Sequence, residues 1–287
     1  MKKLSEEISN CISIHTQEMY MLRNMVGDIN ALVFNRPPKD ILPPVPKEFR
    51  KEFWEYIDEF MDFMGGVIRE TERKKSKKQE WLFKTSKQYP EEIQKLLIPT
   101  LLSIYRTFKY PSVFYNMALT QLITLSEDFL SGFIQTVLVS NPNMLKSEKM
   151  VTYEAILSFS SMKKMENYLA DEISKEILEE NIDKMAEKIN RRFSIDISKF
   201  IGFEMIREAF YRRNVIVHNN CVADEKYCQK VKKSKIGQQI ETDFKYMERA
   251  FDEIGKFIDY MDDNFSKKFK YERTSISNRL LYPPDID

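Results

Sequence analysis

Apolar residues recur every three or four positions along most of this chain, the spacing that gathers them on one side of an α-helix. The clearest stretch begins at a capping residue, Thr242 or Asp243, and continues with Phe244, Met247, Phe251, Ile254, Ile258 and Met261. No segment alternates apolar and polar residues over the length of a strand. The 287 residues include only 7 glycines, fewer than turn-dense β architectures require. The sequence therefore predicts an all-α fold.

The same periodicity locates the individual helices. They are expected over about 5–34, 47–75, 90–109, 111–139, 174–192, 199–219 and 243–261. Pro99 is expected to break or kink the third, because proline lacks a backbone donor, and Pro111 to open the fourth. Residues 150–159 remain unassigned, since periodicity cannot type a short apolar run.

Proline and charge patterns suggest how the chain is divided. Five prolines between Arg36 and Pro46 predict a stiff, extended linker over 36–46. We expect an N-terminal helical region at 1–110, a helical bundle at 111–263 and a loosely ordered polar and basic tail at 264–287. Residues 69–80 are dense in charge, which is typical either of a solvated helical face or of a patch that contacts phosphate.

Composition limits the classes of function. The 45 basic and 44 acidic residues predict no overall attraction to nucleic acid, so contact with RNA would need local basic patches. No apolar run approaches the 18 residues or so of a membrane span, and the first residues lack the apolar core of a signal peptide. The 3 cysteines show no paired spacing. A reducing cytoplasm is the expected location.

A candidate functional motif ends the helix expected over 199–219. It contains Arg213, Asn214 and His218, which is one of only 2 histidines in the chain. Arg213 and His218 would be separated by a rise of roughly 7.5 Å along the helix. Asn214 and His218 are four residues apart and share a face, whereas Arg213 is turned about 140° from His218. A permanent cation, an amide and a titratable imidazole suit acid–base chemistry on a phosphodiester.

Other reactive side chains carry weaker signals. His15 has no nearby pair of carboxylates and is interpreted as structural. Cys221 and Cys228 are too widely spaced for a zinc knuckle and are expected to be free thiols. The two histidines lie far apart and neither belongs to a carboxylate–histidine cluster, so we expect no metal site and no cofactor.

Three features of residues 112–262 together resemble the HEPN superfamily, in the branch of small ribonuclease-like helical domains of prokaryotic defence and toxin systems. The first is Arg213 to Asn220, which is similar to the family's Arg-x4-6-His signature in its Arg-Asn-x-x-x-His form. The second is the Lys235-Ile236-Gly237 step before the closing helix. The third is the polar and acidic step from Leu125 to Leu130. One departure is Cys221, where relatives often carry glycine. The first 110 residues show no resemblance that we can name.

The resemblance implies a helical bundle that forms a two-fold homodimer, with the motif helices of both copies lining one composite cleft. It also implies a metal-independent endoribonuclease of toxin or anti-phage type. His218 would then act as general base or acid, because an unperturbed imidazole, with a pKa of about 6.5, suits either role at neutral pH. Arg213 would neutralise the phosphate, and Asn214 would orient His218 or donate to a phosphate oxygen.

Further residues are expected around this site. Arg212 is either an auxiliary phosphate contact or a surface charge. A lysine-rich loop is expected to guide single-stranded RNA, through Lys226, Lys230, Lys232, Lys233 and Lys235. Supporting partners of the motif are expected to be Glu127, Asp128 and Asn219, although the two carboxylates also suit a role as surface or helix-pairing charges.

Two other functions fit the same sequence. The chain could be a non-catalytic helical dimerisation or interaction module, or a regulatory domain whose cleft binds a nucleotide. The expected partners are RNA, a second copy of the chain and an inhibitory or activating protein. No contact with a membrane is expected.

Overall fold

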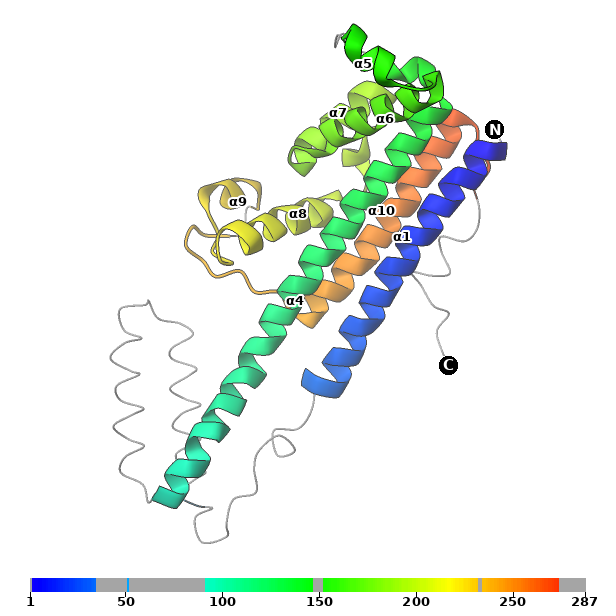
Figure 1. Ribbon diagram of the computed structural model, residues 1–287. Helices are drawn as coiled ribbons and strands as arrows, with labels where there is room; N and C mark the ends of the chain where they lie inside the picture. The colour runs from blue at the N-terminus through cyan, green and yellow to red at the C-terminus, as the bar shows by residue number, and fades with distance from the viewer. Residues whose placement is uncertain (1, 35–50, 52–90, 147–151, 232–233, 274–287) are drawn as a thin grey trace. The chain divides into compact units, whose positions relative to one another are not determined.

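The computed structural model of the protein describes residues 2–34, 51, 91–146, 152–231 and 234–273 (Figure 1). Within these ranges the regular secondary structure is helical, and the extended pairing is limited to an isolated antiparallel bridge between Val222 and Gln239. The predicted all-α fold is confirmed. Outside the described residues lie the proline-rich linker, nearly all of the expected helix 47–75, the charged segment 69–80, and Lys232 and Lys233.

The chain divides into two compact units. Unit 1 comprises Met1–Asp28 and Ser112–Asp287, and unit 2 comprises Ile29–Pro111. The sequence predicted a separate helical region at 1–110. This prediction is wrong for the first helix, which belongs with the C-terminal bundle in unit 1. In unit 2 the structure describes a π-helical turn, η1 (Asn30–Phe34), residue 51, and the first part of helix α4.

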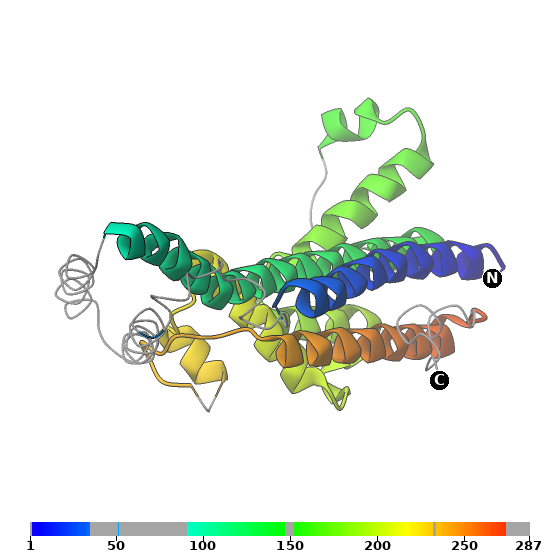
Figure 2. The same cartoon turned by 90° about the horizontal axis from the view of Figure 1, so that it is seen from below.

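Three long helices lie side by side in unit 1: α1 (Lys2–Ile29), α10 (Phe244–Phe269) and the part of α4 (Glu91–Ser140) that begins at Ser112 (Figures 1 and 2). Phe133 of α4 meets Phe265 of α10 edge-on, with ring centroids 5.0 Å apart. The helices α1 and α4 approach closely at Gly132, where an added Cβ would lie 3.3 Å from the sulfur of Cys11. The apolar face of α1 is thus buried against its neighbours, which explains why this helix joins unit 1.

Helix α4 continues through Pro99 and Pro111, so the expected break between two helices is not present. A proline removes one backbone donor and can kink a helix, but the residues on either side can still continue it. The division between the two units falls directly after Pro111.

Residues 174–192 form parts of two helices rather than the single helix expected. Helix α6 (Met162–Leu178) ends before Asn181, whose side chain accepts a hydrogen bond from the backbone nitrogen of Lys184 at 3.2 Å and caps α7 (Ile182–Phe193). The 3₁₀ turn η4 (Pro142–Leu145) packs on α6, and the unassigned segment 150–159 contains the short helix α5 (Tyr153–Ser158).

The motif helix, α8 (Phe203–His218), follows a 3₁₀ turn, η5 (Ile197–Lys199), capped by Asp196. It ends where the sequence predicted, and Asn220 and Cys221 then adopt left-handed backbone angles, with φ of 53° and 63°. The segment after it was expected to be a loop but contains the helix α9 (Glu225–Lys230), because Asp224 accepts a hydrogen bond from the backbone of Tyr227 at 2.7 Å.

The beginning of the expected tail is ordered. Helix α10 extends to Phe269, and Asp262 on its buried side accepts hydrogen bonds from the hydroxyl of Tyr271 and from Nε of Arg273, both at 2.7 Å. These two partners of a buried carboxylate fix residues 270–273 against the bundle. Residues 274–287 lie outside the described part of the chain.

One stretch, Tyr110–Ser140 within α4, is long and apolar enough to cross a membrane by length and composition. More than half of its most apolar window is buried, as in the core helix of many soluble proteins, so it is weak evidence of a span. Within the described ranges, no other helix meets these two conditions.

Replacement of Asn181 tests whether α6 and α7 are two separate helices or one continuous helix. We predict that Asn181→Ala lowers the free energy of unfolding by about 1 kcal/mol, because the first turn of α7 loses its acceptor. Asn181→Asp, which keeps the acceptor, is the matched control. In a single continuous helix Asn181→Ala would instead raise stability by roughly half a kcal/mol, because alanine favours helix interiors. Urea denaturation of the three proteins gives the sign.

Candidate functional site

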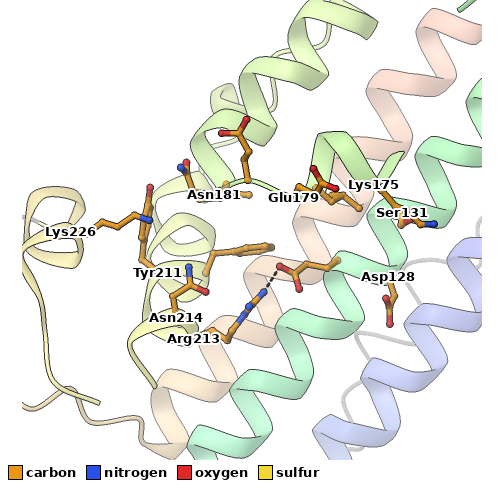
Figure 3. A pocket seen from close by; sticks show the side chains of 14 residues that line it. Asp128, Ser131, Lys175, Glu179, Asn181, Tyr211, Arg213, Asn214 and Lys226 are labelled. Atoms are coloured by element: carbon orange, nitrogen blue, oxygen red, sulfur yellow. Dashed lines mark hydrogen bonds and ion pairs between the residues drawn. The ribbon is translucent and has the colours of Figure 1, made fainter. Parts of the chain in front are cut away.

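A cavity of about 600 Å³ lies among helices α4, α6, α7, α8 and α9 (Figure 3). Helix α8 contributes Tyr211, Arg213 and Asn214, and the rest of the lining carries two lysines and four carboxylates. The remaining charged side chains on its lining are Glu127, Asp128, Lys175, Glu179, Glu180 and Lys226. The mixture favours a polar ligand that carries its own charge.

The motif arginine is fixed by an ion pair across this cavity. Nη2 of Arg213 donates to Oε1 of Glu127 on α4, 86 residues away in the sequence, as the dashed line in Figure 3 marks. Nε of Arg213 is buried and has no hydrogen-bond partner among the described residues. Burial raises the pKa of Glu127, and Arg213 opposes part of this rise. The pair therefore orients Arg213 while leaving some of its donors unused.

The structure separates Arg213 from His218. Asn214 lines the cavity with Arg213, but His218 is exposed at the last residue of α8 and is not on the cavity lining. Within the described ranges His218 has no hydrogen bond or ion pair. Arg213 thus faces α4, and His218 is available to solvent one helical turn beyond Asn214.

Arg212 belongs to a different set of contacts, which we call the Glu208 cluster: Glu208, Arg212, Tyr227 and Tyr246. Nε of Arg212 donates to Glu208 at 2.8 Å, and its guanidinium carbon lies 3.9 Å from the ring centre of Tyr246. Glu208 also accepts hydrogen bonds from both tyrosine hydroxyls. Only 13% of the Arg212 side chain is exposed. Arg212, expected to be either an auxiliary phosphate contact or a surface charge, is thus largely buried and packs between α8 and α10.

The expected lysines and supporting residues are only partly gathered. Lys226 lines the cavity, whereas Lys230 pairs with Asp183 at 2.8 Å, and Lys235 is exposed away from the cavity lining. Asp128 is on the cavity lining with Glu127. The side chain of Asn219 instead closes the turn after α8, by donating to the carbonyl of Val222 at 2.5 Å.

Sequence reasoning missed Tyr211, Lys175 and Glu179 on the cavity lining. The hydroxyl of Tyr211 donates to Asp183 at 3.0 Å, and burial raises the pKa of this tyrosine, with Asp183 adding to the rise. Its position three residues before Asn214 and seven before His218 could have identified it as a neighbour on the same helical face.

The other reactive side chains, the three cysteines and His15, do not line the cavity. The three cysteines are free thiols, and burial raises the pKa of Cys11 to about 12. His15 packs edge-on against Phe129 at the contact of α1 with α4. Among the residues that the structure describes, no three or more histidine, cysteine or acidic side chains form a group that could hold a metal ion.

Comparisons with protein-family models, with curated proteins and with solved structures gave no match. The resemblance to the HEPN superfamily therefore rests on the sequence features given above.

The raised pKa of Glu127 predicts a pH effect of known sign. A carboxyl whose pKa is higher in the folded state binds its proton more tightly there, so its contribution to stability falls as pH rises from about 4.5 through the raised value. Glu127→Gln keeps the size and an acceptor for Arg213 but cannot titrate. We predict that the unfolding free energy of the wild type, minus that of Glu127→Gln, decreases over this range. A flat or rising difference in pH-dependent denaturation would contradict the raised pKa.

Proposed function

We propose that this protein is a HEPN-type, metal-independent endoribonuclease of a toxin or anti-phage system, acting in the cytoplasm. The observation that carries the proposal is the arrangement on α8. Arg213 is held in a fixed orientation on the cavity lining, next to Asn214. His218, one helical turn beyond Asn214, is exposed and has no partner among the described residues. Acid–base catalysis needs an accessible imidazole, and phosphate recognition needs an ordered guanidinium.

The reaction follows from these groups. An imidazole accepts the proton of a ribose 2′-hydroxyl while the 2′-oxygen forms a bond to the adjacent phosphorus. The bond from phosphorus to the 5′-oxygen then breaks, and that oxygen takes up a proton. The products are a 2′,3′-cyclic phosphate and a 5′-hydroxyl, with no net change in protons. His218 supplies or accepts the proton, and Arg213 stabilises the charge on phosphorus-bound oxygens.

Arg213 can meet a phosphate without releasing Glu127. The guanidinium has five donors, and the ion pair engages Nη2. Nε is fully buried, so the donors left for a phosphate are on Nη1, which makes no hydrogen bond within the described residues. Glu127 is accordingly a positioning residue in this proposal, because it acts by holding the arginine.

A second copy of the chain completes the site. Arg213 and His218 are turned about 140° from each other on one helix, so one copy does not present both to a single phosphate. Exposed apolar side chains lie close to this end of α8: Val217 on α8, and Val113 and Met117 on α4. The amide of Asn116 donates to the sulfur of Cys221 at 3.3 Å, which places that turn of α4 beside the end of α8. This apolar surface supports a homodimer that brings two motifs together.

Replacement of His218 tests catalysis. We expect His218→Ala to reduce RNA cleavage in the presence of a metal chelator by at least about a hundredfold, the usual contribution of a general acid or base. Lys163→Ala, at an exposed position of α6 outside the cavity lining, is the control and should cleave at the wild-type rate. Cleavage by His218→Ala at the wild-type rate would exclude the proposed role. Circular dichroism and size-exclusion chromatography establish that each variant is folded and of wild-type size.

Mixing two inactive variants tests the composite site. If Arg213 of one copy acts with His218 of the other, a mixture of Arg213→Ala and His218→Ala refolded together regains about a quarter of wild-type activity. Half of the dimers are then mixed, and each mixed dimer has one intact site of two. No recovery, in mixtures shown by native mass spectrometry to contain mixed dimers, would contradict sharing of the site.

The alternative is a non-catalytic dimerisation or interaction module, or a regulatory domain that binds a nucleotide. The engagement of Arg213 by Glu127 favours this alternative, because an ion pair of this kind also holds α8 against α4 without any substrate. A wild-type protein that dimerises but cleaves no RNA, alone or with an activating protein partner, would support it.

A further inference from the structure

A second cavity, separate from the one beside the motif, lies among η4, α6 and α7. Its volume is about 490 Å³, within the range of small-molecule sites. The buried side chains of Ile173 and Ile177 form an apolar part of its lining. Lys175 and Leu178 on the same helix line the first cavity, so the end of α6 separates the two. No residue lines both.

Cationic side chains from two segments converge on this cavity. Lys146 follows η4, and Lys188, Arg191 and Arg192 come from α7. Glu176 is the single carboxylate on the lining. A concave site with this excess of positive charge attracts an anion, and its apolar part can hold an organic group at the same time.

Two of these cations are fixed, and two are available. Nη1 of Arg192 donates to the carbonyl of Met144 at 2.6 Å, and Nζ of Lys188 donates to the carbonyl of Glu176 at 2.6 Å. Lys188 also pairs with Glu180 at 3.1 Å. Lys146 and Arg191 are exposed and make no hydrogen bond or ion pair within the described part of the chain.

A purely structural explanation covers only part of this arrangement. Arg191 and Arg192 lie in the last turn of α7, where basic residues interact favourably with the helix dipole. That effect does not explain why Lys146, from a different segment, lines the same cavity as these arginines, or why the lining includes buried isoleucines.

We propose that this cavity binds a small phosphate-bearing ligand of mononucleotide size. The phosphate lies among Lys146, Arg191 and Arg192, and the organic group lies against Ile173 and Ile177. A single concave site fits a small molecule better than an RNA strand, which needs cations and stacking side chains along an extended track.

The test is calorimetric titration of the full chain with adenosine 5′-monophosphate, inorganic phosphate, adenosine and a short single-stranded RNA. The test variant is Lys146→Ala combined with Arg191→Ala, two exposed positions whose loss leaves no partner behind. The matched control is Lys163→Ala combined with Lys164→Ala, which removes the same charge from the exposed start of α6. Arg213→Ala reports binding in the first cavity instead.

We expect adenosine 5′-monophosphate to bind more tightly than either inorganic phosphate or adenosine. The test variant should weaken its affinity at least about tenfold, since two charge-assisted hydrogen bonds are lost, and the control and Arg213→Ala should match the wild type. Absence of binding, equal weakening in the control, loss in Arg213→Ala, or an effect on RNA alone would each overturn the proposal. Because the readout is binding rather than cleavage, its outcome is independent of the proposed nuclease activity.

Discussion

The placement of α8 depends on Glu208, whose carboxylate accepts hydrogen bonds from three elements at once. Its partners are Arg212 on α8 itself, Tyr227 on α9 and Tyr246 on α10. A largely buried carboxylate is costly unless it is fully paired, so these donors can satisfy Glu208 only in one arrangement of the three helices. That arrangement turns Arg213 toward α4, places Asn214 on the cavity lining and leaves the end of α8, with His218, in solvent.

The ion pair of Arg213 with Glu127 adds the second constraint on α8. It joins this helix to the long core helix α4 and closes one side of the cavity. Adjacent arginines in the sequence thus have different roles: Arg212 holds α8 to α10, whereas Arg213 crosses to α4. A motif in which Arg213 and His218 point in different directions is consistent with the proposed site between two copies. It equally explains how α8 would be held in a non-catalytic module.

Local patterns predicted the fold well, and contacts between distant residues were the main source of error. The end of α8 and the start of α10 follow from apolar spacing and from the capping residues Asn219 and Asp243, which act within a few residues. The split at Asn181 carried the same kind of signal but was missed because helical spacing continues across it. The burial of Arg212 could not be predicted, because it depends on Glu208 and Tyr246 meeting it in the folded bundle. Glu127 was proposed through a family resemblance rather than from spacing, for the same reason.

The most direct test of the account is the chemistry of RNA ends formed in cells. Expression of the wild type should arrest growth and produce RNA fragments with 5′-hydroxyl and 2′,3′-cyclic phosphate ends, because a 2′-oxygen attacks without a metal-activated water. Expression of His218→Ala at the same level should produce neither. Intact RNA in both, fragments with 5′-phosphate ends, or the same fragments from His218→Ala would contradict the claim that α8 carries the catalytic group.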